Sequence, residues 1–123
     1  MVIAVKTQPE QLRDRTKSSA LRVIRLFQSL PYRPDVQVLG KQMLRCGTSV
    51  AANYRAVCRS RSQAEFVARM GIVVEEADEA VLWPELFTES GIVPQEKTRE
   101  LGAEVRELMA IFTASQQTAR KAA

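Results

Sequence analysis

Apolar residues recur every three or four positions along four stretches of the 123-residue chain, and proline or turn-forming residues separate those stretches. This period is typical of α-helices that bury one face. We therefore predict four helices, at about residues 9–30, 34–60, 62–90 and 94–118. Since short connections join long helices, neighbours should run antiparallel. The predicted fold is all-α, one up-down-up-down four-helix bundle over residues 1–123. The alternative is a longer helical hairpin that completes its core only by dimerising.

Local signals mark the ends of these helices. Thr7 and Pro9 suit the start of the first helix, as a cap and a first-turn proline. Ser62 and Glu65 form a capping-box pattern at the start of the third, and Gly91 suits its end. Pro84 removes a helical hydrogen bond, so we expect a kink near residues 80–83 or a break with a new turn starting at the proline. The last residues, 118–123, are expected to fray.

The second predicted helix carries two opposed stripes. At about 100° per residue, the apolar stripe contains Val36, Leu39, Met43, Cys46, Val50, Tyr54 and Val57. The opposite stripe contains Lys41, Arg45, Arg55 and Arg59, and Arg61 continues it. This spacing can follow a phosphate backbone and add affinity without reading a base sequence. The candidate nucleic-acid-binding residues are therefore Lys41, Arg45, Arg55, Arg59 and Arg61.

The net charge of +4 is unevenly distributed along the chain. Residues 1–74 hold 13 lysines and arginines against 4 acidic residues, whereas residues 75–123 hold 5 against 10. This division predicts a basic region and an acidic region. The acidic cluster Glu75, Glu76, Asp78 and Glu79 can pair with arginines within or between subunits. We favour that pairing for Arg55 and Arg59, and expect Lys41, Arg45 and Arg61 to be free.

The third predicted helix is apolar on two sides. One face contains Phe66, Met70, Val73, Val74, Ala77 and Val81, and a second, mixed face contains Ile72, Glu75, Glu79, Leu82, Trp83 and Leu86. A helix with two partly apolar sides needs two packing partners. We predict that the first face enters the bundle and the second meets another subunit. The candidate subunit-interface residues are Ile72, Glu75, Glu79, Trp83 and Leu86.

The residue inventory argues against catalysis. The chain has no histidine, so it lacks the commonest proton shuttle and the Glu-x-x-His pairs of carboxylate-bridged metal bundles. Cys46 and Cys58 have no histidine base beside them, and no glycine-rich phosphate loop occurs. We therefore expect no catalytic residues, no metal ligands and no cofactor. No long apolar run or signal sequence is found, the latter across Met1–Lys6, so a cytoplasmic protein without a membrane segment is expected.

Several motifs resemble those of a known family. They are the stretch Cys46-Gly47-Thr48-Ser49-Val50-Ala51-Ala52-Asn53-Tyr54-Arg55-Ala56, then Arg59-Ser60-Arg61-Ser62, Glu65-Phe66, Glu75-Glu76-Ala77-Asp78-Glu79 and Trp83. Over about residues 18–115, the chain resembles the four-helix-bundle family encoded by intervening sequences of large-subunit ribosomal RNA genes. That family is similar to the accessory variability protein of diversity-generating retroelements. The resemblance implies a homopentameric ring. In the retroelement branch it also implies a basic surface that engages nucleic acid and a reverse transcriptase. Pro84 departs from the expected apolar residue after the tryptophan.

Two functions remain open from the sequence. The first is a non-enzymatic, self-assembling bundle, a homopentamer whose basic surface engages RNA, DNA or a nucleic-acid-processing partner. The second is a structural oligomer that binds only protein and pairs its charges within the assembly.

Overall fold

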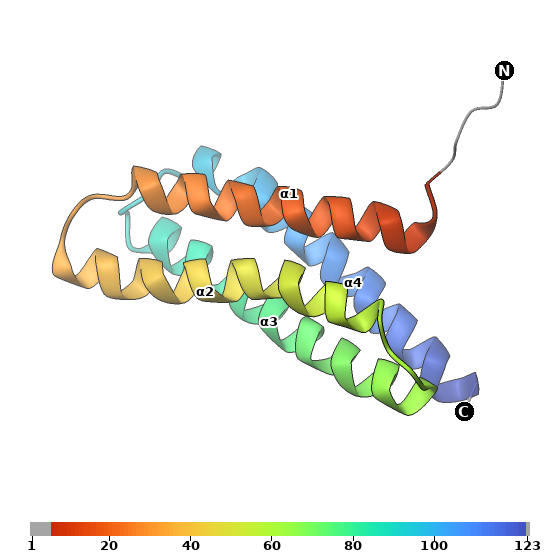
Figure 1. Cartoon of the computed structure of the whole chain (residues 1–123). Helices are drawn as coiled ribbons and strands as arrows, with labels where there is room; N and C mark the ends of the chain where they lie inside the picture. The colour runs from red at the N-terminus through yellow and green to blue at the C-terminus, as the bar shows by residue number, and fades with distance from the viewer. Residues whose placement is uncertain (1–5, 123) are drawn as a thin grey trace, which may run out of the picture.

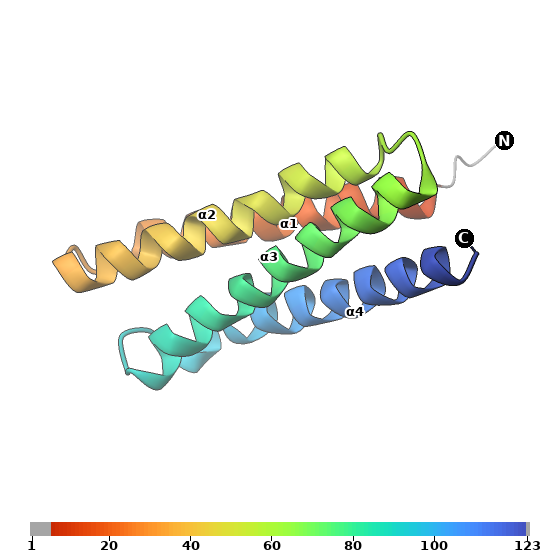
Figure 2. The same ribbon diagram turned by 90° about the horizontal axis from the view of Figure 1, so that it is seen from below.

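The computed structural model describes residues 6–122, and within them the chain is all-α (Figure 1). The helices are α1 (Gln8–Ser29), α2 (Pro34–Val57), α3 (Gln63–Glu89) and α4 (Arg99–Ala122), with a short 3-10 helix, η1 (Gln95–Lys97), before α4. Successive helices run antiparallel and form two hairpins, α1–α2 and α3–α4; the second hairpin is inclined to the first (Figures 1 and 2). The predicted all-α chain of four helices is therefore confirmed. Most of the segment searched for a signal sequence, Met1–Val5, lies outside the described residues.

The predicted helix-end signals act as expected. The side chain of Thr7 accepts a hydrogen bond from the backbone N–H of Glu10 at 3.3 Å. Ser62 accepts one from the N–H of Glu65 at 3.1 Å. Gly91 has φ of 78°, a left-handed conformation that glycine adopts without strain, and it follows the last residues of α3. Each of the two side-chain hydrogen bonds satisfies a backbone N–H that the helix itself leaves free.

The structure corrects two expectations about helix ends and breaks. Of the two alternatives for Pro84, the break is wrong, because α3 runs without interruption from Gln63 to Glu89 and buries the proline; the kink stays a prediction. Pro84 lines a hollow together with Gly102 and Arg106 of α4, and α3 as a whole packs on both α2 and α4. These tertiary contacts offset the helical hydrogen bond that the proline removes. The final turns of α4 are also helical as far as Ala122. Gln116 Nε2 donates to the carbonyl of Val67 at 2.9 Å, and Gln63 donates to the carbonyl of Ala119, so α3 ties down this end.

The core lies between the two hairpins. Its largest fully buried side chains are Phe87, Phe112, Met43, Met70 and Leu108. The ring of Tyr54 from α2 stacks on that of Phe112 from α4, with centroids 5.2 Å apart. Consecutive helices pack closely, whereas α1 approaches α4 less closely. There Arg15 joins the helices through a bidentate contact with Glu104, at 2.6 and 3.0 Å. The hydrogen bonds that Arg15 donates lower the pKa of the Glu104 carboxyl.

Glycine allows α1 and α2 to approach each other closely. A Cβ atom at Gly47 would lie 2.7 and 2.8 Å from the two methyl groups of Val23, which is fully buried. These distances are shorter than a carbon–carbon contact tolerates. A Cβ at Gly40 would lie 3.0 Å from atoms of Phe27 and Leu30. The helix propensity lost at these glycines is therefore offset by closer packing of α1 on α2.

Candidate nucleic-acid and subunit interfaces

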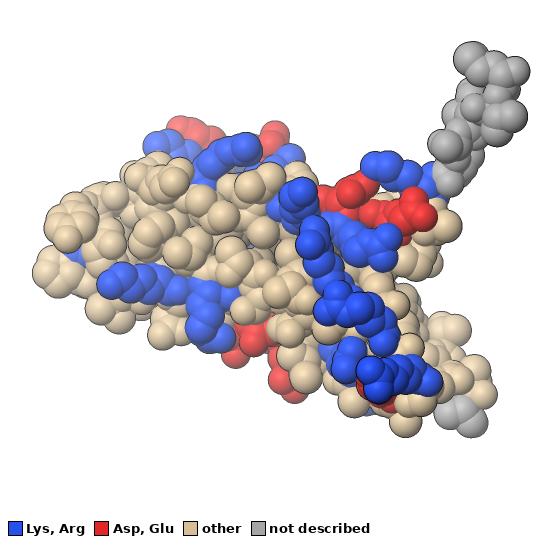
Figure 3. All heavy atoms as spheres, in the orientation of Figure 1, with Lys and Arg blue, Asp and Glu red and all other residues tan. Residues whose placement is uncertain are grey.

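The five candidate nucleic-acid-binding residues are all exposed, but they fall into two groups. Lys41 and Arg45 lie one helical turn apart on α2, and Arg45 lies near the middle of that helix. Arg55 lies in the last turn of α2, and Arg59 and Arg61 follow in the α2–α3 connection. Figure 3 shows blue side chains along α2 and, separately, a band of them over the end of that helix. The two groups have different neighbours.

Arg45, which was expected to be free, is paired within the chain. Its guanidinium lies 3.3 Å from Glu79 and 3.8 Å from Glu76, both on α3. Arg55 and Arg59, which were expected to pair with this acidic cluster, have no carboxylate within 4.0 Å in residues 6–122. For Arg45, Arg55 and Arg59 the expected pattern is therefore reversed inside the subunit.

The antiparallel register of α2 and α3 explains this reversal. Near the middle of both helices, Arg45 of α2 contacts Glu79 of α3. Eleven residues later in α2, the carbonyl of Ala56 accepts a hydrogen bond from Arg69, which precedes Glu79 in α3 by ten residues. The middle of α2 therefore faces the acidic middle of α3, and the end of α2 faces the start of α3. The only carboxylate in that first part of α3, Glu65, pairs with Arg69 at 2.7 Å.

Two further basic residues, which the sequence analysis did not single out, lie near the end of α2. Arg13 of α1 lines a hollow of about 340 Å³ together with Tyr54, Cys58 and Ser60. Lys17 lies one turn further along α1, on the same side. We call Arg13, Lys17, Arg55, Arg59 and Arg61 the terminal basic band (Figure 3). The sequence does carry a signal for these two residues, because Arg13 and Lys17 are four positions apart and lie outside the apolar face of α1.

The band continues around a second hollow, of about 490 Å³. It is lined by Ala56, Arg59, Arg61, Glu65 and Arg69. Arg69 donates to the carbonyl of Ala56 at 2.7 Å and thereby links α3 to the last turn of α2. This contact steadies the connection that carries Arg59 and Arg61, while their own side chains are exposed to solvent. The arrangement can bind an extended polyanion through charge.

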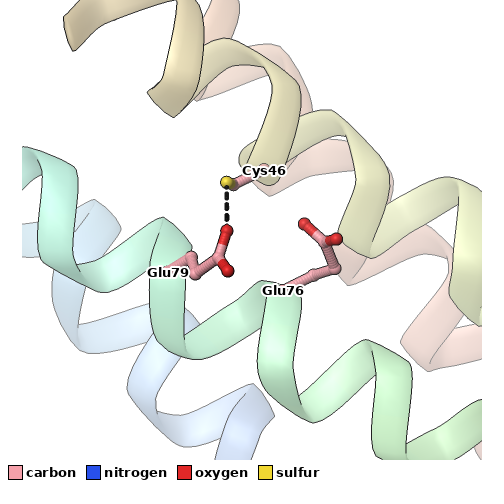
Figure 4. Close-up of side chains that lie close together, drawn as sticks. All are labelled: Cys46, Glu76 and Glu79. Carbon is pink, nitrogen blue, oxygen red and sulfur yellow. Dashed lines mark hydrogen bonds between the residues drawn. The ribbon is translucent and has the colours of Figure 1, made fainter.

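A polar cluster joins α2 to α3 beside the other group. Cys46, Glu76 and Glu79 place one possible ligand atom each within 4.8 Å of one another (Figure 4). The Cys46 thiol donates to Glu79 at 2.9 Å. Burial, and next the hydrogen bond to Glu79, raise the pKa of the Cys46 thiol to about 11. The thiol therefore stays protonated near neutral pH, and Arg45 supplies positive charge to both carboxylates. We interpret this cluster as a hydrogen-bonded ion pair between helices.

The outer face of α3 exposes apolar side chains, as the two-sided pattern predicts. Ile72, Leu82 and Leu86 are 49%, 43% and 39% exposed. At about 100° per residue they lie within an arc of roughly 80°. Glu75 and Glu79 lie on the same face and are also exposed. Trp83 is only partly buried and packs against the core of its own subunit, at the border of this face. The five predicted interface residues thus share one side of α3.

Helices in residues 6–122 offer no segment with the length and apolar character needed to cross a membrane.

These features define a class of protein, an all-α bundle of two antiparallel hairpins with a basic end and an apolar outer face on α3. The family model of 23S rRNA-intervening sequence proteins matches residues 11–114. The chain belongs to this family, and the resemblance found in the sequence is confirmed. It is also similar to a crystal structure from Bacteroides thetaiotaomicron of a protein with unknown function from the S23 ribosomal protein family. The two are 27% identical with a TM-score of 0.79, over 85% of this chain and 97% of that one. No curated protein matches the sequence.

Proposed function

We propose that this protein is a non-enzymatic, self-associating bundle whose basic surface engages nucleic acid or a nucleic-acid-processing partner. The observation that carries the proposal is the group of exposed arginines at the end of α2. Arg55, Arg59 and Arg61 have no carboxylate within 4.0 Å in the described part of the chain. Like charges held close together repel, so a cluster of this kind gains free energy when a polyanion neutralises it.

Self-association is supported by the outer face of α3. Three large apolar side chains there are each more than a third exposed, and covering them removes apolar area from water at about 25 cal/mol per Å². The family resemblance points to five subunits arranged in a ring. In such a ring each subunit would present its own basic surface, and several weak contacts would add up to a tighter one. A reverse transcriptase is the partner implied by the retroelement branch.

Two features support the absence of catalysis. The chain has no histidine, and the buried Cys46 thiol, whose pKa is raised to about 11, is a poor nucleophile near neutral pH. In residues 6–122, the carboxylates beside that thiol, Glu76 and Glu79, form ion pairs with Arg45. Assay of the purified protein for hydrolysis of RNA, DNA and nucleotides should give no protein-dependent turnover. Turnover that survives repeated purification would contradict the non-enzymatic part of the proposal.

Binding is tested by titrating labelled RNA and DNA with the purified protein at several salt concentrations. We expect affinity at low salt that falls steeply as salt rises, because bound cationic side chains release counterions from the phosphates. No binding at about 50 mM salt would remove the nucleic-acid part of the proposal. The second candidate function, a scaffold that binds only protein, would then remain, since the apolar outer face of α3 supports it independently.

Self-association is tested by light scattering with a matched pair of variants. Ile72→Ser combined with Leu86→Ser should lower the molar mass toward that of one subunit. The control is Leu21→Ser, which removes a leucine 43% exposed on α1 and should leave the mass unchanged. A monomeric wild type at micromolar concentration would contradict self-association. An unaltered mass in the double variant would move the interface away from this face.

A further inference from the structure

We infer that the terminal basic band, rather than the Lys41–Arg45 pair, is the nucleic-acid-binding surface, and that its ligand is the sugar–phosphate backbone of a duplex. This inference rests on the proposed function and specifies its site and ligand. It adds Arg13 and Lys17 of α1 to the surface and removes Lys41 and Arg45 from it.

The first argument is local charge balance. Arg45 faces Glu79 at 3.3 Å and Glu76 at 3.8 Å, so its charge is neutralised within the chain. Lys41, one turn earlier, has no ion pair in residues 6–122 and is left as a single positive charge. The five members of the band have no ion pair in residues 6–122. Of the nearby acidic residues, Glu65 pairs with Arg69 and Asp14 with Lys6, which leaves Glu10 in the first turn of α1. Excess positive charge therefore gathers at the band.

The second argument is placement. The band crosses from α1 over the last turn of α2 to the α2–α3 connection, as Figure 3 shows. A stripe along a single helix places charges on one line, whereas this band draws on three segments held together by tertiary contacts. Arg69 links α3 to the carbonyl of Ala56, and this restricts the part of the chain from which Arg59 and Arg61 extend. A restrained surface loses less conformational entropy when it binds.

The third argument concerns the form of the nucleic acid. Proteins that bind single strands without sequence preference stack bases on exposed aromatic rings. The band has no such ring, because Tyr54 is 4% exposed and Phe66 is partly buried. The aromatic side chain that is highly exposed in residues 6–122, Tyr32, follows α1 at the opposite end of α2. A surface that offers charge alone favours a duplex, which carries one negative charge per about 1.7 Å of its axis.

Two charge-matched variants of the full chain test the site. The first combines Arg59→Glu with Arg61→Glu, and the second combines Lys41→Glu with Arg45→Glu, so both change the net charge equally. Far-ultraviolet circular dichroism and thermal unfolding check that both remain folded. The probes are a short RNA duplex, the matching DNA duplex and each single strand, titrated between about 50 and 200 mM salt.

Five phosphate contacts in one subunit predict that wild-type affinity for the duplex falls about 500-fold over this salt range. The Arg59→Glu/Arg61→Glu variant keeps three of these contacts, so its affinity for the duplex should fall only about 40-fold over the same salt range. At 50 mM salt its affinity should be about a hundredfold lower than that of the wild type. The Lys41–Arg45 variant should stay within about threefold of the wild type. Both duplexes should bind more tightly than the single strands, because a duplex carries the denser charge.

The outcomes separate the inference from the proposed function. Loss of binding in the Lys41–Arg45 variant alone would overturn the inference and leave the proposed function standing. Equal losses in both variants would also overturn it, since net charge rather than position would then decide affinity. Tighter binding of single strands would overturn the choice of a duplex. A wild type that binds none of the probes at low salt would remove both the nucleic-acid function and this site.

Discussion

The middle of α2 and the segment from its last turn into the α2–α3 connection, here the two halves of the basic stripe, differ in their contacts with the rest of the chain. Around residues 40–47 the helix is in contact on both sides, with Gly47 against Val23 of α1 and Cys46 and Arg45 against Glu79 of α3. Around residues 55–61 the arginines extend into solvent without an ion pair in the described chain. The sequence shows one basic stripe across both halves. The structure pairs Arg45 of the first half with α3 and leaves the arginines of the second half without an ion pair in residues 6–122.

The largest expected effect comes from the tightly packed half. Gly47→Ala should lower the free energy of unfolding by about 1–2 kcal/mol, because overpacking a core costs about 1–3 kcal/mol and improved helix propensity returns less than about 1 kcal/mol. Chemical denaturation measures this change. Adding Val23→Ala should recover part of the loss that the glycine substitution causes.

Gly71→Ala is the matched control. There the added Cβ would meet only Gln116 Nε2, at 3.0 Å. The gain in helix propensity is offset by displacement of the Gln116 hydrogen bond to Val67, so we expect a net change within about 0.5 kcal/mol. Equal losses at Gly47 and Gly71 would show that close approach of α1 does not explain the glycine in α2.

The second prediction concerns pH and Cys46. Burial raises the pKa of this thiol from 9.0 to about 11 in the folded protein. The unfolded chain therefore loses its proton first, and folding stability should fall as pH rises from 9 toward 11. At pH 10 the loss is on the order of 1 kcal/mol. Denaturation across this range should show a shallower decline for Cys46→Ala than for the wild type. Parallel curves for the two proteins would contradict the assignment.

The third prediction tests the ion pair between α2 and α3. Glu79→Gln should destabilise the protein by about 0.5 kcal/mol, because both partners are roughly half exposed and exposed pairs contribute little. The effect should shrink in high salt. If Arg45 is the partner, the double variant Arg45→Gln/Glu79→Gln should lose less than the sum of the two single losses. Additive losses would show that the two side chains are not coupled.

The smallest expected effect comes from the free half. Replacing Arg59 and Arg61 together by glutamine should change the free energy of unfolding by less than about 0.5 kcal/mol, since neither residue has an ion pair in residues 6–122. Thermal unfolding measures it. A loss comparable to that of Gly47→Ala would mean that these arginines support the fold, and would remove the contrast between the halves.

The helices and their buried faces could be predicted from the sequence because those signals are local. A cap such as Ser62 acts within one turn, and an apolar period repeats along one helix. Where a local rule met tertiary packing, it failed. Pro84 did not break α3, and α4 is helical as far as Ala122, because neighbouring helices supply contacts that local propensity lacks.

Sequence alone thus determined the all-α class, the positions of the helices, the two-sided third helix and the family. The tertiary structure alone decided which arginines are paired, that Cys46 meets Glu79, and that Arg13 of α1 lies near the end of α2. The reason is geometric. A helical period places residues around one axis, but ion pairing depends on the register and rotation of one helix against another, which are set by the packing of the whole core.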